Sequence, residues 1–558
     1  MRAWISGALF REPVVTAAGA LLVATVLVPL GMLVACLSRR ARARMPALLG
    51  LAPLPGLGAA LLAIDAPPLV LDPARLRLTL AIDSPGAMLL GVAALLWSAA
   101  GVYTWTYLED DPSAGRFAEW WLLTLTGSLG VFVAGDLATF YIAFAIVSLA
   151  AWGLVAHDGT PRARRAGAIY LGLAVLGEIF LLLAFALLAV ASPTDSLAIR
   201  DVVAAFPTSP WRNVTLAFLI AGFGLKAGLL PFHVWLPLAH PAAPMPASAV
   251  LSGAIIKAGV IGLVRFLPIE AGMPAWGEAL TALGLLTAYY GVAIGITQDN
   301  PKTVLAYSSV SQMGVVAAVL GMGLAQRDTA AALAASFYAV HHLLAKGALF
   351  LAVGVVAATG ARRLWPALLL VAVIALGLGG LPLSGGALAK LAVKAPLGKG
   401  LASTLATLSA AGTTLLMLHF LHRLSRHTSA EPDRTAPAGL AWPWLAAALA
   451  SVAIPWALYS RVAGAPATDS LSPGDLWAAL WPMAIGGILA VGLRRWGYRL
   501  PRVPEGDVVV VGADATRAAR VWGDSLERAE GFLQQWPIAG VLLLALTVIL
   551  GGALLLGR

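Results

Sequence analysis

The chain has 558 residues, of which 60% are hydrophobic and only 11% are charged. Soluble domains carry roughly 25% charged residues, so this composition excludes a soluble globular enzyme, a disordered chain and a secreted disulfide-linked scaffold. In a soluble protein the net charge of +10 would suggest nucleic acid, but here the basic residues fall in short stretches between apolar segments, where they signal membrane topology. We therefore expect an all-α polytopic membrane protein that contacts the lipid bilayer and has no nucleic-acid partner.

Apolar segments long enough to cross a membrane recur from one end of the chain to the other. A spanning helix needs about 20 apolar residues, which predicts about 16 transmembrane helices here. We place them at residues 14–37, 46–64, 84–106, 118–134, 136–156, 166–192, 214–243, 246–267, 275–297, 302–323, 329–358, 366–400, 402–422, 438–460, 474–493 and 537–557. The one sizeable polar stretch, residues 501–536, is expected to be a cytoplasmic connector, with or without an amphipathic surface helix in its second half.

The distribution of arginine and lysine between the spans predicts the orientation. Clusters follow odd-numbered spans, at residues 39–44, 162–165, 362–363, 423–434 and 494–502, whereas the other loops carry fewer basic residues. The positive-inside rule then places these loops in the cytoplasm and both termini on the outer, periplasmic side of a bacterial inner membrane.

Two of the predicted spans are interrupted by glycine and proline, at residues 224–231 and 377–386. Proline removes a backbone donor, and in lipid an opened helix survives only where protein or a water-filled cavity satisfies the backbone. The two interruptions lie five spans apart. An odd offset gives two units of opposite orientation, which predicts inverted repeats of the kind found in transporters.

Ionisable side chains within predicted spans are costly and therefore indicate function. We expect them to form a proton pathway made of Lys226, Lys257, His342, Lys346, Lys390, Glu178, His341 and Lys394. The pairs at 342 and 346 and at 390 and 394 are four residues apart and share a helix face. Two alternatives stay open, since Lys394 can extend to the outer interface and His341 can simply bond a neighbouring carbonyl. Acidic groups for a sodium site are scarce, which favours protons.

The chain contains no recognisable source of chemical energy. Its single cysteine, Cys36, cannot form an internal disulfide, a zinc site or an iron–sulfur cluster by itself. The sequence has neither a CxxCH motif for haem nor a GxxxxGK[ST] motif for nucleotide phosphates. We expect no cofactor, no metal and no catalytic centre of its own, so that an ion gradient or a partner must supply the energy.

The segment 226–265 reads KAGLLPFHVWLPLAHPAAPMPASAVLSGAIIKAGVIGLVR and resembles the antiporter-like membrane subunits of respiratory complex I, Mrp-type sodium/proton antiporters and membrane-bound hydrogenases. The runs QDNPKTVLAYSSVSQMG at 298–314 and HLLAKGALF at 342–350 are similar to the same family. The resemblance covers about residues 80–425. It implies N-terminal helices in 1–117, two inverted five-helix repeats in 118–268 and 269–425, C-terminal helices in 426–558, and a hydrated chain of polar residues along the membrane midplane.

The resemblance also implies roles for individual residues. Lys226 matches the family's lysine in the broken seventh span, and Lys257 matches the lysine of the eighth span that links two half-channels. His342 and Lys346 match a central His and Lys of the eleventh span. Lys390 matches the terminal ionisable residue of the broken twelfth span, with one extra residue in the preceding stretch.

One position departs from the family pattern. The family usually carries a Trp-Glu pair in the fifth span, whose glutamate partners the lysine of the seventh span, but this chain has Phe144-Ala145 there. Glu178 is the remaining carboxylate within a nearby span. We therefore expect Glu178 to take over as the partner of Lys226.

Three functions are compatible with these features. The first is a proton-translocating, or sodium/proton-antiporting, membrane subunit that works with other membrane subunits of a complex I-like, hydrogenase or Mrp-type assembly. The second is the membrane subunit of an inorganic carbon uptake complex that pairs with a soluble zinc protein. The third is a structural membrane subunit that no longer conducts. Only the first would make the chain part of a proton-translocating oxidoreductase or of an antiporter.

Overall fold

The computed structural model describes residues 16–64, 66–72, 77–192, 196–497, 500–501, 503–507 and 509. The chain divides into two compact units, Met1–Val503 and Pro504–Arg558, and all elements described below belong to the first. The expected span at 537–557 and most of the expected connector at 501–536 lie outside the described residues.

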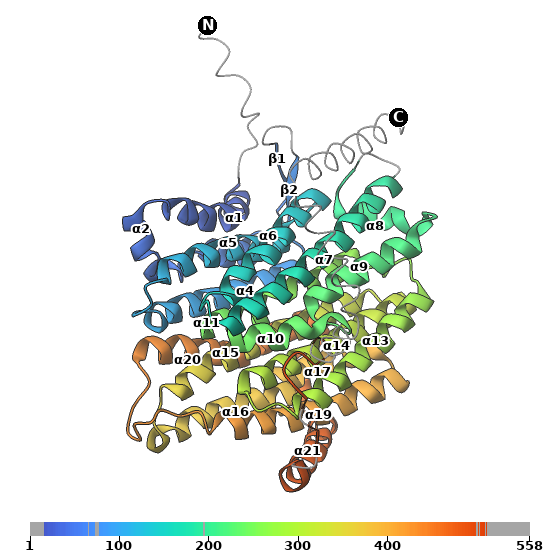
Figure 1. Cartoon of the computed structure of the whole chain (residues 1–558). Coiled ribbons are helices and arrows are strands. Elements are labelled where there is room, and N and C mark those ends of the chain that lie inside the picture. Colours follow the sequence, from blue (N-terminus) through green and yellow to red (C-terminus); the bar gives the residue numbers. More distant parts are fainter. Residues whose placement is uncertain are drawn as a thin grey trace, which may run out of the picture. The chain divides into compact units, whose positions relative to one another are not determined.

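The first half of the described chain contains helices and one small hairpin (Figure 1). In chain order they are α1 (Ala17–Ala35), α2 (Arg39–Arg44), η1 (Met45–Leu48), α3 (Leu54–Leu62), β1 (Leu69–Leu71), β2 (Leu78–Leu80), α4 (Ser84–Tyr107), α5 (Ala114–Val133), α6 (Leu137–Val155), α7 (Pro161–Ala191), α8 (Ile199–Ala205), η3 (Phe206–Thr208), α9 (Arg212–Ala227), η4 (Phe232–Val234), α10 (Trp235–Ala242), α11 (Met245–Val250), η5 (Leu251–Ile255) and α12 (Lys257–Phe266). The two strands pair antiparallel, with Leu69 opposite Leu80.

The second half is helical throughout the described residues. Its elements are α13 (Pro274–Gly295), α14 (Pro301–Gln326), α15 (Ala330–Ala357), η6 (Ala361–Arg363), α16 (Trp365–Gly379), α17 (Gly385–Ala392), α18 (Lys394–Leu397), α19 (Leu401–Leu424), α20 (Ala438–Ala463), η7 (Ala467–Leu471) and α21 (Pro473–Trp496).

The expectation of an all-α polytopic membrane protein is confirmed. Within the described residues, twelve helical segments are long and apolar enough to cross a membrane. The expected span at 46–64 differs from the prediction, because Pro46 and Pro53 each start a new helical turn and leave only η1 and the nine-residue α3. The total of about sixteen spans stays a prediction.

Both predicted interruptions are present, and in both of them a glycine ends the helix. Helix α9 is closed by Gly228 and α16 by Gly380, and each glycine adopts a left-handed conformation, with φ of 86° and 105°. A side chain would be strained at such a φ, so glycine is the residue that allows the helix to stop there. A proline follows within three residues in each case and prevents the helix from continuing. The inverted relation of the two repeats stays a prediction.

The helices that carry half of the predicted pathway residues lie at the centre of the bundle. The spans Met245–Phe266, α14 and α15 are buried over their whole apolar windows, whereas α1 and α21 expose most of theirs. Helix α15 packs against α4 on one side and against α16 and α20 on the other (Figure 1). Side chains on α14 and α15 are thus shielded from lipid by other helices.

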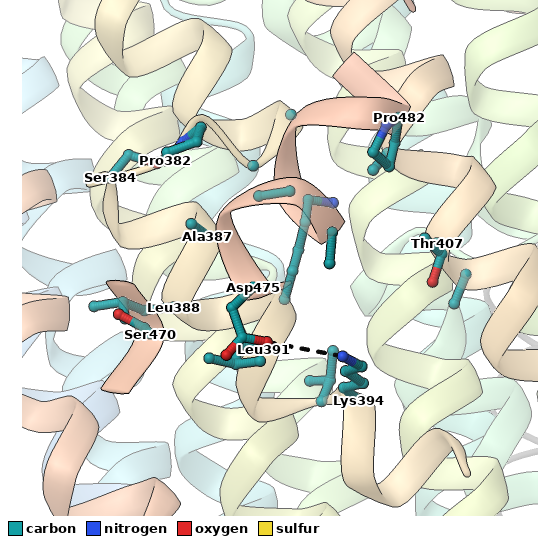
Figure 2. A pocket seen from close by; sticks show the side chains of 18 of the residues that line it. Pro382, Ser384, Ala387, Leu388, Leu391, Lys394, Thr407, Ser470, Asp475 and Pro482 are labelled. Atoms are coloured by element: carbon teal, nitrogen blue, oxygen red, sulfur yellow. Dashed lines mark ion pairs between the residues drawn. The ribbon is translucent and has the colours of Figure 1, made fainter. Parts of the chain in front are cut away.

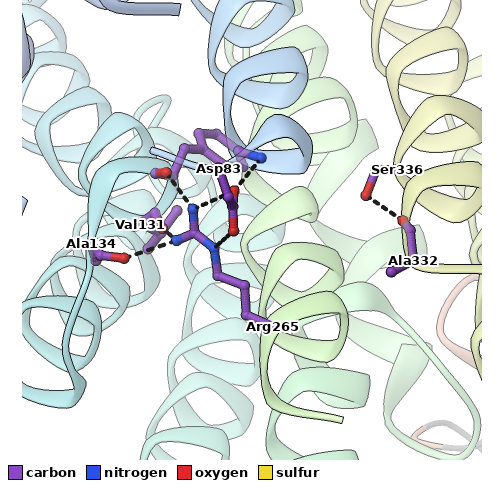
Figure 3. A network of polar contacts seen from close by, with 8 residues as sticks. Asp83, Val131, Ala134, Arg265, Ala332 and Ser336 are labelled. Atoms are coloured by element: carbon purple, nitrogen blue, oxygen red, sulfur yellow. Dashed lines mark hydrogen bonds and ion pairs between the residues drawn. The ribbon is translucent and has the colours of Figure 1, made fainter. Parts of the chain in front are cut away.

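One arginine joins three helix ends outside this centre (Figure 3). Arg265, in the last turn of α12, makes a bidentate pair with Asp83 at 2.9 Å and donates to the backbone oxygens of Val131, Phe132 and Ala134 at the end of α5. Asp83 in turn caps the start of α4. Burial raises the pKa of Asp83, but the Arg265 guanidinium outweighs burial and holds that pKa below its usual range. Asp83 therefore adds stability at neutral pH that is lost as the pH falls through its lowered pKa.

Replacing Arg265 with Gln is expected to lower the apparent melting temperature of the purified chain. The change leaves buried carbonyl oxygens at the end of α5 without donors, and one such loss costs about 1–3 kcal/mol. The matched control is Arg362→Gln, because Arg362 pairs with Asp433 where both side chains are exposed and such pairs are worth about 0–1 kcal/mol. Equal shifts for the two variants would contradict a structural role specific to Arg265.

Candidate functional site

The first cluster of ionisable residues lies between α6, α7 and α9. Lys226 is buried in the last turn of α9, and its Nζ donates to the Tyr170 hydroxyl at 3.2 Å. The Tyr170 hydroxyl in turn donates a hydrogen bond to the backbone oxygen of Ser148 at 2.7 Å. The Lys226 ammonium also lies 5.9 Å from the centre of the Phe144 ring, which occupies the place where the family usually carries tryptophan.

Glu178 belongs to this first cluster. It lies two helical turns beyond Tyr170 on α7, is only 7% exposed, and interacts electrostatically with Lys226. Neither carboxylate oxygen has a hydrogen bond of standard geometry to another described residue, although Ser148 lies nearby. Glu178 therefore faces the protein interior on the same side as Lys226, as the proposed partnership requires.

The second cluster lies at the contact between α12 and α15. Lys257 and His342 are completely buried, and the lysine Nζ lies 2.8 Å from the histidine Nδ1. Lys257 is the first residue of α12 and is separated by one residue from the π-helical turn η5, a distortion that often marks functional positions. The other ring nitrogen of His342, Nε2, is buried without a hydrogen-bond partner among the described residues.

Lys346 extends the second cluster by one helical turn of α15. Its Nζ donates to the Leu305 backbone oxygen at 2.7 Å and to the Ser308 hydroxyl, both on α14. The next residue on α14, Ser309, shares a 2.8 Å hydrogen bond with Ser252 of η5. Hydroxyl groups thus line the junction of α12, α14 and α15, and no carboxylate neutralises its two lysines by an ion pair in the described structure.

The third cluster surrounds the second broken span. Lys390 on α17 lies 5.9 Å from the centre of the Tyr338 ring, and the Tyr338 hydroxyl donates to Gln312. Gln312 then donates to Thr413 of α19 at 2.8 Å. His341, the residue before His342, interacts electrostatically with Lys390.

His341 lies directly against the break between α16 and α17. A Cβ atom at Gly385 or Gly386 would lie 2.9 Å from one of its ring nitrogens, and at Gly386 it would also clash with the Gly377 carbonyl. Both glycines are therefore required for this close approach. Within the described residues the two ring nitrogens of His341 make no hydrogen bond of standard geometry, but the Ser451 backbone lies near the ring, so the alternative in which His341 simply bonds a carbonyl stays open.

A cavity of about 260 Å³ opens beside Lys390. It is lined by α17, α18, α19 and the start of α21, and Figure 2 shows the Lys394 ammonium facing Asp475 across it. The Nζ to Oδ1 distance of this pair is 3.9 Å, and the Lys394 side chain is 61% exposed. The structure therefore separates Lys394 from the seven buried or partly buried residues, because α18 ends three residues later and lets the side chain reach the surface.

Two buried residues of this region were not among the predicted site residues. Lys302 was expected only as the first residue of the span 302–323, and it lies in the first turn of α14, where it donates to the Ala243 backbone oxygen at the end of α10. His240 of α10 is fully buried and stacks on Phe350, with ring centres 4.6 Å apart. His240 begins the sequence run HPAAP, and Lys302 ends the run QDNPK. The burial of both residues depends on the packing of α10 against α14, which the runs themselves do not show. No group of three potential metal ligands occurs in the described part of the chain.

The fold and the site together define a class of protein. It is a polytopic helical membrane protein with two broken spans and with buried lysine and histidine side chains among its helices. The chain belongs to the NADH:quinone oxidoreductase/Mrp antiporter transmembrane family, whose model matches residues 134–418, about half of the chain.

Several curated relatives share about half of this chain. Hydrogenase-4 component B of Escherichia coli is 32% identical over 50% of this chain and 43% of its own length. NADH-quinone oxidoreductase subunit N of Desulforudis audaxviator is 34% identical over 51% of this chain and 57% of its own length. Na⁺/H⁺ antiporter subunit A1 of Staphylococcus saprophyticus is 31% identical over 47% of this chain and 34% of its own length. This chain thus spans between about a third and somewhat over half of the length of these relatives.

Two solved structures share the fold. A chain of the Mrp complex from Dietzia sp. matches with a TM-score of 0.71 and 22% identity, over 97% of this chain and 63% of that chain. A chain of the membrane-bound sulfane sulfur reductase, an archaeal respiratory membrane complex, matches with a TM-score of 0.67 and 21% identity, over 84% of this chain and 99% of that chain.

Proposed function

We propose that this chain is a proton-translocating membrane subunit of a multisubunit complex of the complex I-like, hydrogenase or Mrp type. The observation that carries the proposal is the 2.8 Å contact between Lys257 and His342, both of which are fully buried. A buried amine and imidazole in contact form a pair that can exchange one proton. The names of the relatives, which are subunits of a hydrogenase, a quinone reductase and an antiporter, support the same function.

The proton transfer at this contact follows from the two atoms involved. When Lys257 is an ammonium, it donates to Nδ1 of a neutral His342. Transfer of that proton leaves a neutral amine, and the imidazolium then donates back to it through Nδ1. The imidazolium can release its other proton from Nε2, which is free of protein partners among the described residues. Lys346, one turn along the same helix face, is the next group in reach through a hydroxyl or a water.

The three clusters then work in series. Glu178 and Lys226 exchange a proton at one end, the Lys257–His342–Lys346 group forms the middle, and His341 with Lys390 forms the other end. Between the clusters the protein provides hydroxyl groups, including Tyr170, rather than continuous hydrogen bonds, so waters and side-chain rotation must bridge the gaps. The cavity beside Lys390 supplies space for such water at its end of the row.

The topology assigns this end of the row to one side of the membrane. The cavity is bordered by the end of the twelfth span at α18 and by the start of the fifteenth span at α21, which both lie on the outer side if both termini are outside. We propose a bacterial inner membrane with this orientation, so that Lys390 exchanges protons with the periplasmic side. The driving reaction and the neighbouring membrane subunits belong to the rest of the complex.

The test starts from the native assembly. An affinity tag on this chain should co-purify further membrane subunits, and their identity names the driving reaction. The purified assembly, reconstituted into vesicles with a pH-sensitive dye, should acidify or alkalinise the lumen when that reaction runs. An assembly that runs its reaction without any proton movement would contradict the proposal and favour a structural, non-conducting subunit.

A further inference from the structure

A second cavity lies away from the row of buried amines, where three helix ends meet. Its volume is about 510 Å³, and it is lined by residues that follow α13, by the end of α19 and by the end of α21. These are the ends of the ninth, thirteenth and fifteenth predicted spans. All three are odd-numbered, so the expected topology places the cavity at the cytoplasmic surface of the membrane.

Most of the ionisable side chains that line this cavity are basic. Its lining includes His419, His422, Arg423, Arg426 and Arg494, and Asp299 is the one carboxylate among the described lining residues. The three arginines lie close enough to His422 to interact with it electrostatically. Such a group of like charges is unfavourable unless an anion or water balances it.

Only one of the three arginines is neutralised. Arg423 forms an ion pair with Asp299, yet its Nε remains buried without a hydrogen-bond partner in the described part of the chain. Arg426 and Arg494 are exposed and form no ion pair with any described residue. The cavity therefore presents two unpaired guanidinium groups and one unused N–H, which suit the oxygens of a phosphate group.

The apolar residues at the same place distinguish a phospholipid from a soluble anion. Leu418, Ala490 and Leu493 line the cavity beside the charges. On α21, Leu489 and Ile485 lie one and two helical turns before Leu493 on the same face and are 48% and 37% exposed, so an apolar stripe runs from the cavity along the helix. A charged pocket at the end of an exposed apolar helix face matches a headgroup with its acyl chains.

We propose that this cavity binds a phosphate group, supplied by an anionic phospholipid of the cytoplasmic leaflet whose acyl chains lie along α21. Basic pockets between transmembrane helices on the cytoplasmic side bind such headgroups, and the leaflet is rich in anionic lipid. The site lies apart from the proton row and does not depend on the proposed function.

The experiment measures the apparent melting temperature of the delipidated, purified full-length chain in neutral detergent. Phosphatidylglycerol added to the micelles should raise this temperature, whereas phosphatidylcholine should raise it less, because its choline group cancels the phosphate charge. Inorganic phosphate forms a third arm. A rise with phosphate equal to that with phosphatidylglycerol would assign the site to free phosphate, and a rise with phosphatidylglycerol alone assigns it to the lipid.

A variant pair makes the test specific to the cavity. The double variant Arg426→Gln/Arg494→Gln should lose most of the rise and should retain less phosphatidylglycerol in native mass spectrometry. The control, Arg164→Gln/Arg165→Gln, removes two exposed arginines from another predicted cytoplasmic loop and should behave like the wild type. Equal losses in both double variants would overturn the proposal. So would a wild-type chain that responds to neither phosphatidylglycerol nor phosphate, in which case an acidic segment of a partner subunit becomes the better occupant.

Discussion

Replacing Lys257 with Met is expected to reduce proton flux through the reconstituted assembly by about a hundredfold, because positioned proton-transfer groups contribute about 10²–10⁴-fold to the rates they serve. Methionine has nearly the volume of the lysine stem but cannot carry a proton. His342 then loses its only hydrogen-bond partner among the described residues. The proposed row is then interrupted at its middle.

The control for this variant is Lys399→Met, which changes an exposed lysine in the turn before α19. It should leave the flux unchanged. Both variants should assemble in normal amounts, since removing a buried amine does not open a cavity. If the Lys257 variant assembles and conducts like the wild type, Lys257 does not carry protons, and the chain is better described as a scaffold.

Replacing Glu178 with Gln is expected to lower the flux by about tenfold, which corresponds to about 1.4 kcal/mol in the free energy of the limiting step. Glutamine keeps the shape of the side chain and removes the negative charge that interacts with Lys226. Lys226 then holds its proton beside Tyr170 and Phe144 without any carboxylate from α6 or α7. The measurement is the initial rate of vesicle acidification at constant turnover of the driving reaction.

The same change at Glu278, which is exposed on α13, serves as the control and should leave the rate unaltered. A second comparison tests whether Glu178 takes the place of the glutamate that the family usually carries in the fifth span. The variant Ala145→Glu restores a carboxylate to α6 and should recover part of the flux when combined with Glu178→Gln. A Glu178→Gln variant with wild-type flux would show that Lys226 needs no carboxylate partner on α7.

The parts of the fold that depend on local sequence were predictable. Apolar length identified most of the spans, and the glycine–proline runs located both breaks, because backbone conformation there is decided by the residues themselves. The placement of His342 and Lys346 on one face followed from helical spacing alone. The resemblance gave Lys257 and His342 separate roles, and only the structure shows their contact, which joins residues 85 positions apart.

The parts of the structure that depend on packing were harder to predict from the sequence. Burial of Lys302 requires α10 to end at Ala242, so that the Ala243 backbone oxygen can accept from the lysine at the start of α14, which no local pattern encodes. Lys394 is exposed because α18 ends early. Its four-residue spacing from Lys390, which predicted a shared helix face, was therefore misleading. The π-helical turn before Lys257 and the β1–β2 hairpin carry no strong sequence signal. Glu178 was found by elimination, and only the structure brings it to the side of Lys226.

The most direct test of the account asks whether the three clusters form a single path in series. The measurement compares the proton flux of Lys226→Met, Lys390→Met and the double variant in the same reconstituted assembly, with Lys399→Met as the control for an exposed lysine. Groups that act as a unit are strongly non-additive, so the double variant should conduct nearly as fast as the slower single variant, and the control should match the wild type. A double variant whose loss equals the product of the two single losses would contradict a single path, because independent effects multiply.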